Sequence, residues 1–170
     1  ETAMGIHSLT SSQLSLEYHV SGHRLKLHDY GVNGISWLHP ESSTGVFAVY
    51  AMGQRWDVNN LTFRGYKTQA DQGLQHGIAT FVGEGFEVEQ HVLAYENSAL
   101  IEQWQVIRAK SDSLSITRMD SYVLNIPQSD YELLYFDSDW GQEFESSRVQ
   151  LRSKVILETH KGRSSKGQHP

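Results

Sequence analysis

The sequence predicts an all-β fold, a large antiparallel sandwich or barrel, on three observations. Apolar and polar residues alternate with period two in several short runs. Turn-forming residues separate these runs at intervals of about ten residues, as in all-β domains. No long segment has a convincing helical period. With 170 residues, 38% of them hydrophobic, the chain is large enough for one domain with an apolar core.

Four runs have the alternation of a strand with one buried and one solvated face. The apolar positions of these runs are Leu14, Leu16, Tyr18 and Val20; Leu25 and Leu27; Phe86, Val88 and Val92; and Leu114 and Ile116. In each run the residues between these positions are polar or charged. We therefore expect each run to turn its apolar positions towards a common core.

Turn residues connect the runs. Ser21-Gly22-His23 predicts a hairpin between the first two strands, and three later turns are predicted at Gly83-Glu84-Gly85, Glu96-Asn97-Ser98 and Ser111-Asp112-Ser113. Gly83-x-Gly85 follows a strand but lacks the third glycine and the helix of a phosphate-binding loop, so a turn explains it. Residues 31–45 predict a long loop, and the tail from Lys161 has no apolar periodicity.

Composition argues against several classes of protein. The net charge is −6 and no basic patch is visible, so we expect neither a nucleic acid nor a membrane surface as partner. The absence of cysteine excludes disulfides, thiolate zinc sites and a cysteine nucleophile. No apolar run reaches the roughly 18 residues of a membrane helix, and the N-terminus lacks the pattern of a signal peptide. We expect a cytoplasmic bacterial protein rather than a secreted one.

Histidine and tryptophan supply the first candidates for chemistry. His19 and His23 are four residues apart, but on a strand and turn this spacing does not bring two imidazoles together, so no metal and no cofactor is expected. Trp37 and Trp56 are candidates for contact with a carbohydrate. Their alternative role is packing in the core or on a strand face, which is commoner for aromatic residues in β-rich proteins.

The stretch 135–145, YFDSDWGQEFE, places four carboxylates around one tryptophan and one glycine. Asp137 and Asp139 share a strand parity, as do Glu143 and Glu145, so each pair can project together. Glycosidases use two carboxyl groups held about 5 Å or about 7–9 Å apart, a separation that sequence spacing does not show. The alternative is an acidic, solvated connection between strands.

The C-terminal part of the chain resembles a known family. Residues 131–170 are similar to the end of the N-terminal domain of family 36 glycoside hydrolases, which are melibiase-type α-galactosidases and related α-N-acetylgalactosaminidases. The matching positions are Tyr131, Leu133, Trp140, Gly141, Glu143, Leu151, Glu158, Gly162, Ser164, Ser165 and Pro170. Gln142 and Lys166 depart from the arginine and histidine that bacterial members often have. The resemblance is carried by residues 100–170 and extends over residues 14–99.

The resemblance implies a β-supersandwich with a galactose mutarotase-like architecture. In the family it packs against a (β/α)₈ barrel that follows in the chain and carries both catalytic aspartates. We therefore expect residues 1–170 to be a single sandwich domain of a longer, retaining α-galactosidase. The chain ends at Pro170, before the barrel, so it contains no catalytic residue and is expected to be inactive alone. The implied partners are the barrel of the same polypeptide, the galactoside substrate and further copies in a homo-oligomer.

The motif residues are expected to support the interface with the barrel. Trp140 would bury apolar area there, and Glu143 would pair with Arg163. The other motif positions in this role are Gly141, Gly162, Ser164 and Ser165. Two alternatives stay open: a free-standing carbohydrate-binding sandwich that uses Trp37 or Trp56, and a mutarotase-like enzyme with His19, His91 and Glu89 as acid and base candidates.

Overall fold

The computed structural model describes residues 4–38, 46–124, 126–139 and 142–155. The chain divides into two compact units, residues 1–127 and 128–170, and each is described by itself. That they form the single domain expected from the sequence remains a prediction. The strands of the first unit are β1 (Met4–Thr10), β2 (Leu14–Ser21), β3 (Arg24–Val32), β4 (Ile35–Ser36), β5 (Ala48–Ala51), β6 (Gln54–Trp56), β7 (Thr62–Asp71), β8 (Leu74–Val82), β9 (Phe86–Tyr95), β10 (Ile101–Ala109) and β11 (Ile116–Asp120).

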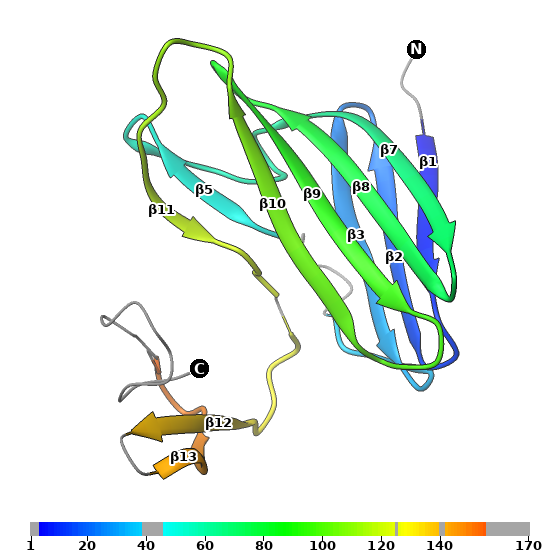
Figure 1. Ribbon diagram of the computed structural model, residues 1–170, viewed down its shortest axis with the longest axis vertical. Helices are drawn as coiled ribbons and strands as arrows, with labels where there is room; N and C mark the ends of the chain where they lie inside the picture. The colour runs from blue at the N-terminus through cyan, green and yellow to red at the C-terminus, as the bar shows by residue number, and fades with distance from the viewer. Residues whose placement is uncertain (1–3, 39–45, 125, 140–141, 156–170) are drawn as a thin grey trace. The chain divides into compact units, whose positions relative to one another are not determined.

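The first unit is a β-sandwich, as the sequence predicts. One sheet has the strand order β1-β2-β3-β4, a second has the order β10-β9-β8-β7, and a third, smaller sheet has the order β11-β5-β6. Neighbouring strands are antiparallel throughout. Figure 1 shows β2 and β3 (blue) in one layer and β7–β10 (green) in the layer that faces it. We call the first the β1–β4 sheet and the second the β7–β10 sheet.

The core lies between these two sheets. Strand β2 alternates buried and half-buried residues along its length, and β9 does the same. Leu16 of β2 and Phe81 of β8 are each 1% exposed, and Phe47 meets the ring of Phe81 edge-on at 5.5 Å. Complete burial of such a side chain stabilises the fold by about 1.5–3 kcal/mol. The alternation of apolar residues in the sequence is therefore the cause of the sandwich.

Glycine-containing turns connect the strands. Gly22 has a φ of 62° in the two-residue turn between β2 and β3, as predicted for Ser21-Gly22-His23. Gly83 and Gly85 lie in the β8–β9 turn, where the Gly83 N–H donates to the Phe86 carbonyl. The prediction of a long loop over residues 31–45 is wrong at its start. Asn33-Gly34, with φ of 51° and 78°, forms a tight hairpin between β3 and β4, because both residues tolerate a positive φ; residues 39–45 lie outside the described residues.

A second correction concerns Leu114 and Ile116. They were expected on one buried face, but only Leu114 packs against the core. Ile116 is 41% exposed, and β11 begins there. A β-bulge between Ile116 and Arg118 shifts the register against β5, so Met119 is the residue of β11 that packs on the core.

The second unit contains a hairpin of β12 (Glu132–Asp139) and β13 (Gln142–Gln150). Arg148 pairs with Glu132 across it at 2.8 Å. Leu134 and Phe136 share a strand parity and are 46% and 43% exposed. The tail from Lys161 lies outside the described residues. Within the part of the chain that the structure describes, no helix is long and apolar enough to cross a membrane.

Candidate functional site

The two tryptophans predicted to contact carbohydrate have different environments. Trp37 follows β4 and is 43% exposed. Trp56 ends β6 and is only 8% exposed. Its indole N–H donates to the Ala51 carbonyl at 3.2 Å, and its ring meets Phe86 edge-on at 5.4 Å. Trp56 is thus a core residue with a satisfied polar atom, and of the two only Trp37 offers a ring surface to a ligand.

The C-terminal motif falls largely outside the described residues. Trp140, Gly141, Gly162, Arg163, Ser164 and Ser165 are all outside them. Glu143 lies on β13, but its side chain is not described. The predicted pairing of Glu143 with Arg163 therefore remains a prediction.

The backbone of the β12–β13 hairpin shows which residues lie opposite the two aspartates. Asp137 lies opposite Glu145, and Asp139 lies opposite Gln142. The extra residue of the register shift lies on β13, where Glu145 and Gln142 are three residues apart, whereas Asp137 and Asp139 are two apart on β12. The side chains of Asp137, Asp139 and Glu143 lie outside the part of the chain that the structure describes, so a catalytic pair among them stays a hypothesis from the sequence.

The outer face of the β7–β10 sheet carries a connected group of polar and aromatic side chains. His91 of β9 is at its centre, with its Nε2 3.1 Å from Glu89 Oε2 and its Nδ1 2.9 Å from Nε2 of His76 on β8. The ring of Trp104 on β10 stacks on His91 at 4.9 Å with an interplanar angle of 11°. Arg108 of β10 reaches Glu89 at 2.6 Å. We call these five residues the His91 network.

The strand register produces the His91 network. Trp104 lies directly opposite His91 in the β9–β10 pair, and Glu89 is two residues from His91, so both carboxylate and indole share the face of the imidazole. The His91 side chain is 12% exposed because these neighbours cover it. His91 and Glu89 are candidates from the sequence, whereas Trp104, Arg108 and His76 are not. Pairing across the predicted turn at 96–98 places Trp104 and Arg108 near His91, and pairing across the predicted turn at 83–85 places His76 there.

The surroundings lower the pKa of two members of this network, Glu89 and His76. The hydrogen bond from Arg108 lowers the pKa of Glu89, with a smaller contribution from His91. Burial lowers the pKa of His76, and the neighbouring His91 adds to the effect. A carboxylate held by a guanidinium is a weak proton acceptor, so Glu89 suits an ordering role better than general-base catalysis.

His19, the other predicted acid–base candidate, lies elsewhere. It is on β2, on the outer face of the β1–β4 sheet, whereas His91 is on the outer face of the opposing sheet. The structure therefore separates His19 from the His91–Glu89 pair by the thickness of the sandwich. Beside His19 it places Glu17 and His28, and His28 was not expected from the sequence.

The fold and the positions of the candidate residues define the class of protein, an all-β sandwich domain. Its candidate acid and base residues lie on two separate outer faces, with His19 on one and the His91–Glu89 pair on the other. The model of the family described as "Glycosyl hydrolase family 36 N-terminal domain" matches residues 82–170, more than half of the chain. The chain belongs to this family. The match begins at Val82, the last residue of β8, and so includes Glu89, His91, Trp104 and the β12–β13 hairpin. No curated protein and no solved structure matches the chain.

Proposed function

We propose that the chain is the non-catalytic N-terminal domain of a retaining, melibiase-type α-galactosidase that hydrolyses terminal α-galactosides. The observation that carries the proposal is the family match over residues 82–170. The Trp-Gly-x-Glu segment at residues 140–143 lies within the matched range. Catalysis is assigned to the barrel of the same polypeptide, and the galactoside is bound there.

The domain's own role is to support that barrel and to form contacts in a homo-oligomer. Leu134 and Phe136 favour the first role, because these two large apolar side chains share one face of the hairpin and neither is buried within it. A two-stranded hairpin is at best marginally stable by itself, so covering this face stabilises it. The proposed occupant is the barrel, since the hairpin lies in the C-terminal unit.

A pair of serine substitutions tests the supporting role. Leu134→Ser with Phe136→Ser should lower the thermal midpoint of the full-length enzyme but leave that of the 170-residue chain nearly unchanged. Leu100→Ser is the matched control, because Leu100 is equally apolar and 57% exposed but lies beside the β9–β10 turn. Equal losses of stability in the chain and in the full-length enzyme would contradict a contact with the barrel.

The catalytic assignment is tested with an aryl α-galactoside. The full-length protein should release the aryl group, and the 170-residue chain should not. A full-length protein active only on a different glycoside would remove the α-galactosidase assignment and leave the domain assignment intact.

A mutarotase-like activity is the second candidate, favoured by the 3.1 Å contact between His91 and Glu89. It predicts that the 170-residue chain accelerates the equilibration of α-galactose, followed by polarimetry, and that His91→Asn abolishes the acceleration. Binding without catalysis predicts instead a millimolar galactose affinity that falls on Trp37→Ala or Trp104→Ala. Neither result is expected if the barrel carries all of the substrate chemistry.

A further inference from the structure

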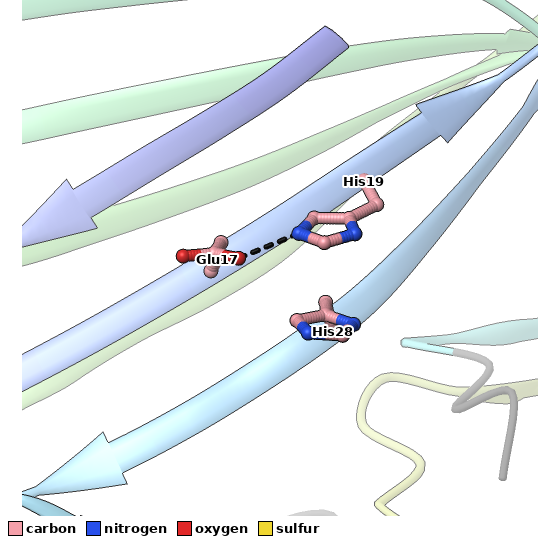
Figure 2. Close-up of side chains that lie close together, drawn as sticks. All are labelled: Glu17, His19 and His28. Carbon is pink, nitrogen blue, oxygen red and sulfur yellow. Dashed lines mark hydrogen bonds and ion pairs between the residues drawn. The ribbon is translucent and has the colours of Figure 1, made fainter. Parts of the chain in front are cut away.

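A β-bulge places two histidines and a glutamate together on the outer face of the β1–β4 sheet. Glu17 of β2 pairs with Asp29 of β3, but the next residue, Tyr18, pairs with Leu27. His28 is the extra residue at this shift, and such bulges redirect side chains. Glu17 and His19 are two apart on β2 and already share this face. Figure 2 shows the three side chains projecting from the two neighbouring strands.

The three side chains approach closely. His19 Nε2 lies 2.5 Å from Glu17 Oε1, and the rings of His19 and His28 stack with centroids 3.8 Å apart and planes 10° from parallel. One nitrogen of each ring and one carboxylate oxygen all lie within 4.8 Å of one another. The side chains of His19 and Glu17 are 37% and 35% exposed, and His28 is exposed, so an ion can reach them from solvent.

We propose that Glu17, His19 and His28 bind a divalent transition-metal ion, with Zn²⁺ as the best fit. Two imidazoles and a carboxylate are a common protein ligand set for zinc, with bonds of about 2.0–2.2 Å, and leave a fourth position for water or another ligand. Strand β2 supplies Glu17 and His19, and the neighbouring strand β3 supplies His28. Zinc is favoured over Mg²⁺ or Ca²⁺ because those ions prefer oxygen ligands alone.

Binding requires two small rearrangements at the surface. The lone pairs of imidazole lie in the ring plane, so the two stacked rings must tilt for one nitrogen of each to reach the same ion. If His19 binds through Nε2, that nitrogen must give up its hydrogen bond to Glu17, with its proton carried on Nδ1 instead. Both rings have solvent on one side, so neither movement disturbs the core.

An adjoining hollow provides space for the fourth ligand. Its walls include two of the three proposed ligands, Glu17 and His28, together with Asp29, Ser36 and Leu38. The Ser36 hydroxyl donates to Asp29 Oδ1 at 2.5 Å, so the Asp29 carboxylate is held in place beside the cluster. A water molecule or a small anion bound to the metal would face this hollow.

The direct test is titration of the 170-residue chain with Zn²⁺ alone, followed by calorimetry, and with Co²⁺, followed by visible absorption. We expect one ion per chain. Loss of a residue that only hydrogen-bonds to a metal ligand already weakens metal binding about 10–100-fold. Loss of a ligand itself, in Glu17→Gln, His19→Asn or His28→Asn, should therefore weaken zinc binding by at least ~10-fold. His23→Asn is the matched control, because His23 lies in the β2–β3 turn outside the cluster, and its binding should be unchanged.

Three results would overturn the proposal: no binding of zinc by the wild-type chain, binding that survives all three ligand substitutions, or loss of binding in His23→Asn. Circular dichroism of each variant checks that the sandwich is folded. A second readout is thermal stability, because an ion that joins β2 to β3 should raise the melting temperature of the wild-type chain but not that of His28→Asn. The proposal does not depend on the α-galactosidase assignment.

Discussion

Replacing Gly83 by alanine tests the packing of the sandwich most sharply. Gly83 lies in the β8–β9 turn, and a Cβ there would come within 2.5 Å of Phe86 Cε1 and 3.0 Å of Leu61 Cδ2. Phe86 and Leu61 are fully buried, and the Phe86 ring is also held by Trp56. Neither neighbour can move without disturbing the core, so the added methyl group must produce strain.

The expected loss is about 2 kcal/mol of unfolding free energy, the middle of the range for an overpacked core site. This corresponds to a roughly 30-fold change in the folding equilibrium and a fall of about 6 °C in melting temperature for a protein of this size. Urea denaturation followed by circular dichroism measures the free energy, and a thermal scan measures the midpoint.

Gly65→Ala is the matched control, since no atom lies within 4 Å of a Cβ built on Gly65 and its φ is not positive. It should be neutral or should stabilise by about 0.4–1 kcal/mol, because alanine restricts the unfolded chain. A Gly83→Ala variant as stable as the wild type would refute the described packing of the β8–β9 turn. Equal losses at both glycines would show that loss of glycine itself, rather than the contact with Phe86, is responsible.

Three further predictions concern strain, burial and charge. Met52 is 53% exposed, and its backbone has a left-handed conformation with a φ of 52°, which asparagine tolerates better than methionine. Met52→Asn should therefore raise the unfolding free energy, measured in urea, by about 0.5–1 kcal/mol. No gain would mean that this turn is unstrained. The Tyr66 hydroxyl is buried and has no hydrogen-bond partner among the described residues, so Tyr66→Phe should stabilise by about 1 kcal/mol at pH 7. Burial also raises the pKa of Tyr66 in the folded state, so the stability of the wild type should fall as pH rises above the ordinary tyrosine pKa of about 10. The stability of Tyr66→Phe should fall less steeply over the same pH range. Parallel profiles of stability against pH would contradict this. Arg108 lowers the pKa of Glu89, so the ionised Glu89 stabilises the fold above the ordinary glutamate pKa, and this stabilisation is lost as pH falls through the lowered pKa. Arg108→Gln should therefore be less stable than the wild type at pH 7 but should approach the wild-type stability at pH 3. A difference in stability that is the same at both pH values would exclude this linkage.

Regular strands could be predicted from the sequence because burial imposes a period of two on them. Leu16 and Val88 face the core as the alternation indicates, and Glu17 and His91 face outwards. The Asn33-Gly34 hairpin was also open to prediction, because this dipeptide is a strong signal for a two-residue turn.

Bulges could not be predicted in the same way. A bulge adds one residue to one strand, which changes the parity of everything beyond it, and no residue type marks the position reliably. Ile116 was therefore assigned to the core although it is exposed, and His28 was missed as a neighbour of Glu17 and His19. The burial of Trp56 depends on contacts with Ala51 and Phe86 that its own surroundings in the sequence do not indicate.

The most direct test of the proposed non-catalytic role compares the 170-residue chain with the full-length protein on an aryl α-galactoside under the same conditions. We predict hydrolysis by the full-length protein and none by the 170-residue chain, because the proposed catalytic aspartates lie on the barrel. Hydrolysis by the 170-residue chain at a rate comparable with that of the full-length protein would contradict it.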